Sequence, residues 1–447
     1  MYKINDSQKF MYFADKSGAG QALLLCGSLL FPSRIDSQKL QDALNELFRI
    51  NDGLRTVFIE KDEEVYQDCR PFERKEFEVK RFSNKQELDD WASVYATIPL
   101  KLDIHSEGSG VSKETWKSEK PSLTLVKNVV LHNTKMFFTK LSMGMLNREK
   151  ACCEMIIVDL PETNGVIFKI HHVVGDAWAI MLIANQLMKI LDGKEVKAFS
   201  FKQLAEKEDT YIGSDRHSRD IAYMKSEYEK CPEATWLWPE HYTSLEATRR
   251  TVILDEDLTS QIMDYCKASN ISPFTLFQAA ICIYMRKRLK RNLFYVGSVA
   301  LNRNDFQEKN TVSMFVTSSP VLIEMEDDFS FADLLNHVRL KSIGIMRHHR
   351  GAEKNADSKK MLYDIWVSYQ NAKLDEDVEV DATQYYCNYS IDTTIFTIED
   401  RSSKGKLKLH FDHNIKVPES DVDELFDIVI STIKRCISDK DVKIAEL

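Results

Sequence analysis

The stretch "IFKIHHVVGDAWAI" (Ile167 to Ile180) decides the fold and raises the question of function. An apolar run typical of a buried strand ends in two adjacent histidines. Asp176 follows four residues after the second histidine. This is the position expected for the N-cap of a helix, where aspartate is a preferred residue. The stretch is therefore either a plain strand–helix junction or the centre of an active site.

The two histidines are not expected to act together. Successive side chains of a strand point to opposite faces, so His172 shares a face with Ile170 and His171 shares one with Lys169. A zinc site needs converging ligands, and no metal is expected here. A buried histidine of purely structural role remains the alternative. The strand end, the nearby carboxylate and the suitability of imidazole for proton transfer near neutral pH favour a catalytic role.

The neighbouring segments alternate between strand and helix patterns. Residues 154–172 predict a hairpin with a turn at "PETNG", and residues 177–192 predict a buried helix that is a plausible boundary between two lobes. Periodicity and capping residues predict further helices at 36–53, 84–100, 272–289 and 420–437, and strands at 54–60, 63–69, 293–301, 361–372 and 405–413.

Composition excludes several classes of protein. A chain of 447 residues with 43% hydrophobic residues predicts two or three domains with large cores. A net charge of −9 argues against nucleic-acid binding. The one basic run, residues 286–291, is typical of a helix end, with docking of an acidic protein partner as the alternative.

The expected location is the cytoplasm. The N-terminus lacks the pattern of a secretory signal, and no apolar run approaches the roughly 18 residues that span a membrane. Nine scattered cysteines without CxxC spacing indicate neither a disulfide framework nor a zinc site, which fits a reducing compartment.

The motif at residues 171–177 resembles the HHxxxDG signature of the condensation domains of nonribosomal peptide synthetases, a family related to chloramphenicol acetyltransferase. Ala177 replaces the final glycine, which a helix start tolerates. The resemblance covers nearly the whole chain in order. It includes "DSQKFMYF" (6–13), "NDGLRTVF" (51–58), "VGSVALNRN" (296–304), "NTVSMFVTSSPV" (310–321) and "LYDIWVSYQNA" (362–372).

Two regions depart from the family pattern. Some forty extra residues, at about 106–150, are expected to form a surface insertion. In "MRHHRGAEKNAD" (346–357) only Arg347 and His348 look retained from a family element, so the contacts of that element are in doubt. His348 and His349 are expected to be surface or helix-end residues.

The resemblance implies an α/β (α+β) fold of two chloramphenicol acetyltransferase-like lobes arranged in a V with a tunnel between them. The expected lobes are residues 1–176, which carry the motif, and residues 177–447. Carrier proteins would deliver both substrates as thioesters on phosphopantetheine arms. The acceptor amine would attack the donor thioester and form an amide, with no bound cofactor and no nucleotide.

The resemblance also implies roles for the motif residues. His172 would be nearest the chemistry, as a general base or as a hydrogen-bond acceptor that positions the amine. His171 would point the other way and support the strand. Gly175 would let the backbone pass close to the substrate arm.

The remaining site residues would be structural. Asp176 would pair with Arg303 across the lobes while capping its helix. Thr317 and Ser318 would line the tunnel wall.

The family motifs begin near the first residue, which resembles starter condensation domains. Such domains N-acylate the first amino acid of a lipopeptide with a fatty acyl group from coenzyme A or a separate acyl carrier. Elongation with an aminoacyl or peptidyl donor remains the alternative, as do a non-catalytic carrier-binding domain and an acyltransferase acting on a free alcohol or amine. The tail "KDVKIAEL" resembles the start of a linker to an adenylation domain. The expected partners are thus an acceptor peptidyl carrier protein, a donor and this adenylation domain.

Overall fold

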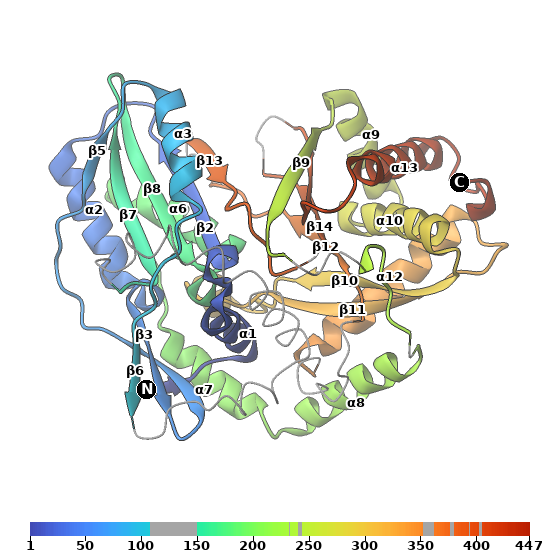
Figure 1. The fold of residues 1–447 in the computed structure, drawn as a ribbon, viewed down its shortest axis with the longest axis horizontal. Helices are drawn as coiled ribbons and strands as arrows, with labels where there is room; N and C mark the ends of the chain where they lie inside the picture. The colour runs from blue at the N-terminus through green and yellow to red at the C-terminus, as the bar shows by residue number, and fades with distance from the viewer. Residues whose placement is uncertain are drawn as a thin grey trace. The chain divides into compact units, whose positions relative to one another are not determined.

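The chain folds into two compact units, each with its own sheet structure, in the computed structural model (Figure 1). The structure describes residues 1–107, 150–231, 233–239, 244–351, 362–375, 380–392, 394–401 and 405–447. Unit 1 comprises Met1–Ile212, Leu301–Val316 and Leu374–Ile391, and unit 2 comprises Gly213–Ala300, Thr317–Lys373 and Asp392–Leu447. Nearly all of the insertion expected at 106–150 lies outside the described residues.

The division differs from the single boundary expected after residue 176. Helix α6 (Ala177–Leu191) belongs to unit 1 because its buried face packs on α2 (Ser37–Ile50). This helix was expected to be buried all round, but only one stripe of it is, which includes Ala179, Ile183 and Leu187. Two later segments also return to unit 1.

The five-stranded sheet of unit 1 positions the histidine pair. Its strand order is β13 (Asp381–Tyr385), β2 (Leu24–Leu30), β8 (Asn164–His171), β7 (Cys153–Asp159), β5 (Val79–Arg81). The hairpin expected from the sequence is confirmed as β7 and β8, and β8 is buried along its whole length. Helix α3 (Lys85–Tyr95) contributes Leu88 and Ala92 to the core against this sheet.

A second, four-stranded sheet of unit 1 has the order β1 (Tyr2–Lys3), β4 (Glu64–Cys69), β3 (Thr56–Lys61), β6 (Ile104–Glu107). The paired strands expected at 54–69 are confirmed as β3 and β4. The helices α1 (Asp6–Ala14), α7 (Phe201–Tyr211) and α11 (Phe306–Lys309) complete the unit's described α-helices together with α2, α3 and α6.

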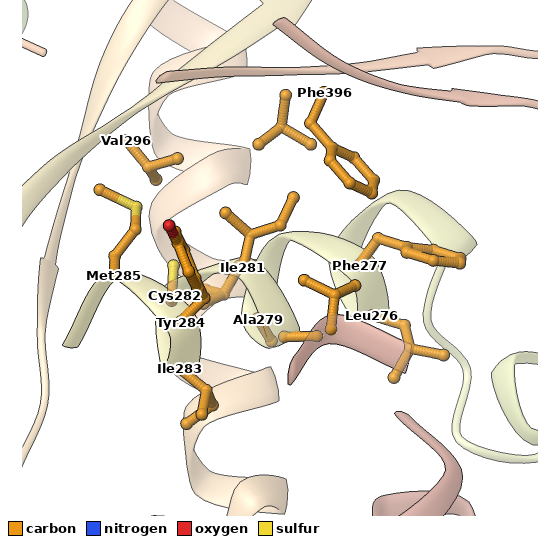
Figure 2. Packing of buried hydrophobic residues seen from close by; sticks show 14 of the residues in the cluster. Leu276, Phe277, Ala279, Ile281, Cys282, Ile283, Tyr284, Met285, Val296 and Phe396 are labelled. Atoms are coloured by element: carbon orange, nitrogen blue, oxygen red, sulfur yellow. The ribbon is translucent and has the colours of Figure 1, made fainter. Parts of the chain in front are cut away.

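Unit 2 is built on a six-stranded sheet. The strand order is β11 (Thr317–Glu324), β10 (Leu293–Ala300), β12 (Ile365–Gln370), β14 (Thr394–Glu399), β15 (Lys408–Asn414), β9 (Ala247–Ile253). Its helices include α8 (Asp215–Glu229), α9 (Glu256–Ala268), α10 (Pro273–Leu289), α12 (Phe331–His348) and α13 (Glu419–Ser438). The core forms between the sheet and helices such as α10, whose Phe277 and Ile281 lie near Phe396 of β14 (Figure 2).

Helix α10 begins and ends where its sequence predicts. Ser272 caps the N-terminus, Pro273 occupies the first turn, and the chain leaves the helix at Lys290 in the left-handed conformation. The basic run covers the last turn of this helix and the two residues after it, as expected for a helix end. Three of its arginines pair with acidic residues of the same unit: Arg286 with Asp327, Arg288 with Asp421, and Arg291 with Glu233.

The last residues of the chain, expected to begin a linker, pack on unit 2. Val442 and Ile444 are buried, and the Ile444 N–H donates to the carbonyl of Phe329 over 3.0 Å. None of the helices in the described part of the chain combines the length and apolar character needed to cross a membrane.

Candidate active site

Strand β8 ends at His171, and a single 3-10 turn, His172–Val174, follows it. The side chain of His171 is fully buried. Its Nδ1 accepts a hydrogen bond from the Val173 N–H over 3.1 Å, and its Nε2 lies 3.3 Å from Oδ1 of Asp15. These contacts are those of a residue that supports the end of the strand.

His172 has a different environment. It is half-buried, and its enclosed Nδ1 has no hydrogen-bond partner among the described residues. Burial lowers the pKa of His172 from its ordinary value, although the negative charge of Asp176 acts in the opposite direction. The imidazole is therefore neutral near pH 7, the form that accepts a proton or a hydrogen bond.

Asp176 is a fully buried carboxylate that caps α6 and holds a second segment of the chain. Its Oδ1 accepts from the Ala179 N–H over 2.9 Å, which is the expected N-cap contact. Nη2 of Arg303 lies 3.0 Å from Oδ1 and 3.2 Å from Oδ2. The N–H groups of Phe315 and Val316 donate to Oδ2 over 3.1 and 3.3 Å.

The pairing of Asp176 with Arg303 lies within unit 1 and does not link the two units as expected from the resemblance. The segment Leu301–Val316 belongs to unit 1, although it follows a strand of unit 2 in the sequence. Arg303 donates to the carbonyls of Thr311 and Ser313, each over 2.8 Å, so it organises the segment that carries it. The ion pair therefore fastens this returning segment to the start of α6.

Two further hydrogen bonds that the sequence did not reveal hold the same segment: Trp178 Nε1 donates to the carbonyl of Lys309 over 2.9 Å, and Asn5 Nδ2 donates to the carbonyl of Met314 over 3.0 Å. The segment also passes close to Gly53, where an added Cβ would meet the carbonyl oxygen of Val312 at 2.2 Å. Gly53 was interpreted only as a helix stop. The close approach of Val312 is a separate reason for a glycine at that position.

Gly175 has an extended backbone, with φ −163° and ψ 151°, that any residue can adopt. A Cβ there would meet only Ile170 Cγ2 at 3.4 Å and Ala179 Cβ at 3.5 Å, which are ordinary contacts. The fold of the chain alone therefore does not require a glycine here.

We expect Gly175→Ala to raise the free energy of unfolding by up to about 1 kcal/mol, because alanine restricts the unfolded chain. If Gly175 leaves room for the substrate arm, as the resemblance implies, the variant should be stable but slower in condensation. Urea unfolding and a condensation assay on the same preparation test this. A stable variant with native activity would show that Gly175 is not needed to leave room for the substrate arm.

The other predicted residues lie in unit 2. Thr317 is buried in β11, and no described residue hydrogen-bonds its Oγ1, whereas Ser318 is exposed. Their role as tunnel lining stays a prediction.

His348 and His349 lie at the end of α12, as expected. Nδ1 of His348 is 2.7 Å from Asp220, and His349 is buried. Within the described ranges, no cluster of three or more histidine, cysteine or acidic side chains is arranged to hold a metal.

Comparisons with known proteins identify the family. A family model described as "Condensation domain" matches residues 1–103 and 145–447. The residues between the two matched ranges overlap the insertion expected at about 106–150. One plipastatin synthase subunit of Bacillus subtilis is 22% identical over 440 residues, covering 92% of this chain and 15% of that protein. Surfactin synthase subunit 1 of the same organism is 21% identical over 438 residues, covering 92% of this chain and 11% of that protein.

Solved structures share the whole fold. The first condensation domain of the calcium-dependent antibiotic synthetase, in complex with a substrate analogue, has a TM-score of 0.76 at 15% identity, covering 100% of this chain and 99% of that chain. A mutant starter condensation domain of rhizomide synthetase, in complex with C8-CoA, has a TM-score of 0.76 at 14% identity, covering 100% of this chain and 97% of that chain.

The mixed α/β fold with two sheet-containing units is thus that of the amide-bond-forming acyltransferases of nonribosomal peptide synthesis. The chain belongs to the condensation domain family. It spans only 15% and 11% of the length of the two Bacillus relatives.

Proposed function

We propose that this chain joins a thioester-bound fatty acyl donor to the amine of an aminoacyl group on a peptidyl carrier protein. The amine nitrogen attacks the thioester carbonyl carbon, the new C–N bond forms as the C–S bond breaks, and the released thiolate takes up a proton. A thioester is already activated, so the protein needs no covalent nucleophile. Its main tasks are to align the two substrates and to manage one proton.

The environment of His172 is the observation that carries the proposal. This half-buried imidazole lies just beyond a buried strand and has a lowered pKa. It is therefore neutral near pH 7 and can accept a proton or a hydrogen bond from the attacking amine. Its Nδ1 is enclosed, and we infer that Nε2 is the ring nitrogen that meets the substrate. His172 then acts as a general base or as the acceptor that orients the amine.

The fatty acyl donor is the finer part of the proposal. The similar structures include a first condensation domain and a starter condensation domain, the latter solved with C8-CoA and, in another variant, with Leu-SNAC as well. We infer an acyl-CoA or acyl carrier donor from these complexes. The acceptor peptidyl carrier protein and a neighbouring adenylation domain are proposed from membership of the condensation domain family. A cytoplasmic location is also proposed, because the nine cysteines lack the spacing of a disulfide framework.

Intact-protein mass spectrometry of an aminoacyl-loaded acceptor carrier tests this function. The chain is mixed with the acceptor and, in separate reactions, with fatty acyl-CoAs, acyl carriers and aminoacyl carriers. A mass gain only from fatty acyl donors supports starter N-acylation. A gain only from aminoacyl carriers makes the chain an elongation domain. Binding of carriers without any mass gain would indicate a non-catalytic carrier-binding domain. Acylation of a free amine or alcohol without a carrier would indicate a different acyltransferase.

A further inference from the structure

The hydrogen bonds of His171 fix its tautomer. Its Nδ1 accepts from the Val173 N–H over 3.1 Å, so this nitrogen carries no proton. The ring proton is then on Nε2, which lies 3.3 Å from Oδ1 of Asp15. The His171 side chain is fully buried, and that of Asp15 is 19% exposed. A carboxylate thus fixes the orientation of the imidazole that immediately precedes His172.

The turn that carries His172 depends on this imidazole. Val173, the next residue, donates its N–H to His171 and accepts a hydrogen bond at its carbonyl from Gln8 Nε2 over 3.2 Å. Gln8 lies in α1, and Asp15 follows directly after that helix. The N-terminal helix and the residue after it therefore hold both backbone groups of Val173, the carbonyl through Gln8 and the N–H through His171, which contacts Asp15.

Gly20 gives an independent indication that the position of the Asp15 carboxylate matters. A Cβ on Gly20 would lie 2.6 Å from Asp15 Oδ1, closer than atoms can approach. The backbone of Gly20 is helical, with φ −53° and ψ −27°, so its conformation does not require glycine. What glycine provides here is room for the carboxylate that contacts His171.

We propose that Asp15 is a positioning residue for the condensation reaction, acting through His171 to hold the turn that orients His172. This proposal rests on the proposed function, because it assigns the reactive imidazole to His172. Asp15 touches no reacting atom. Its effect is on the geometry of His172, where a displacement of about 1 Å can cost about 100-fold in rate.

Four single variants separate positioning from general stability. Asp15→Ala removes the acceptor, Asp15→Asn keeps an oxygen that can accept from Nε2–H, and Gly20→Ala pushes the native carboxylate away. The matched control is Asp6→Ala, which removes a carboxylate from the start of α1. Among the described residues, this carboxylate is ion-paired with Lys9 alone, over 3.8 Å. Thermal unfolding of each variant shows which of them are folded.

We expect Asp15→Ala and Gly20→Ala to lower kcat by about 10- to 100-fold with little change in KM for the acceptor, because only the reacting geometry is lost. Asp15→Asn should recover most of the rate, and Asp6→Ala should match the native protein. Gly20→Ala should add nothing in the Asp15→Ala background, since its methyl group acts only on the carboxylate.

A readout independent of activity uses nitrogen-15 NMR of the histidine rings, with the His171 signals assigned through a His171→Gln variant. The native protein should show His171 as the Nε2–H tautomer, and Asp15→Ala and Gly20→Ala should shift its Nε2 signal. Native kcat in both alanine variants, or Asp15→Asn as slow as Asp15→Ala, would overturn the proposal, and so would a His171 ring protonated at Nδ1. If the native chain condenses no donor, the proposed function fails. The NMR result then still decides whether Asp15 fixes His171.

Discussion

Replacing His172 with alanine is expected to lower the rate of amide formation by about 10²–10⁴-fold, the usual contribution of a general acid or base. The physical reason is the neutral imidazole. Its lowered pKa leaves a free lone pair at neutral pH, and no described residue hydrogen-bonds its enclosed Nδ1. The loss should appear in the single-turnover rate constant, measured as the mass gain of the acceptor carrier with the chain in excess.

A His172→Gln variant distinguishes the two roles that remain open for this residue. Glutamine can accept a hydrogen bond but cannot take a proton at neutral pH. A partial recovery of rate relative to alanine indicates that His172 positions the amine, and no recovery indicates a general base. His105→Ala is a suitable control, because that side chain is 58% exposed and lies in unit 1 as well. A His172→Ala rate within a few-fold of native would place the chemistry elsewhere.

The pH dependence of the native protein follows from the same pKa. Because the pKa of His172 is lowered in the folded chain, the active neutral form should persist below the ordinary histidine value of about 6.5 before the rate falls. The same lowered pKa makes the free energy of unfolding fall as the pH falls. The contribution of this residue to the free energy of unfolding is fully present above the unfolded pKa and is lost as the pH falls through the folded one. His172→Ala should therefore lose less stability on acidification than the native chain.

Local patterns were sufficient to predict the junction that carries the histidines. The apolar run into the histidine pair predicted the strand end one residue beyond the observed end at His171, and the aspartate before an apolar helix predicted the cap of α6 at the observed residue, Asp176. Both features depend on neighbours within a few residues, where periodicity and capping preferences apply. The partner of Asp176 came instead from the resemblance to a family, which predicted Arg303 but placed the pair across the lobes.

Contacts between distant segments were not predictable in this way. Asp15 and His171 are separated by 156 positions, and nothing in either local pattern marks them as neighbours. The return of Leu301–Val316 to unit 1 is likewise invisible in composition, because the segment interrupts the chain between two strands of unit 2. Such pairings are set by how separate elements pack, which residue spacing does not encode.

Asp176→Ala is expected to lower the free energy of unfolding by about 3–5 kcal/mol, because it leaves the Arg303 guanidinium buried without its anion. It also removes the carboxylate oxygens that accept hydrogen bonds from the N–H groups of Ala179, Phe315 and Val316. Urea unfolding measures the loss. Asp305→Ala is the matched control. Asp305 lies in the same returning segment, and its exposed carboxylate caps α11, so its removal should lower the free energy of unfolding by only about 1 kcal/mol.

The double variant Asp176→Ala/Arg303→Met decides what the activity of Asp176 variants means. Replacing both members of a buried ion pair removes the unpaired charge, so the double variant should be more stable than Asp176→Ala, although the stranded N–H groups prevent full recovery. If condensation activity returns together with stability, the carboxylate is structural and its loss acts through the returning segment. An Asp176→Ala chain that is as stable as the native protein but inactive would contradict this, and would give the carboxylate a direct part in the chemistry beside His172.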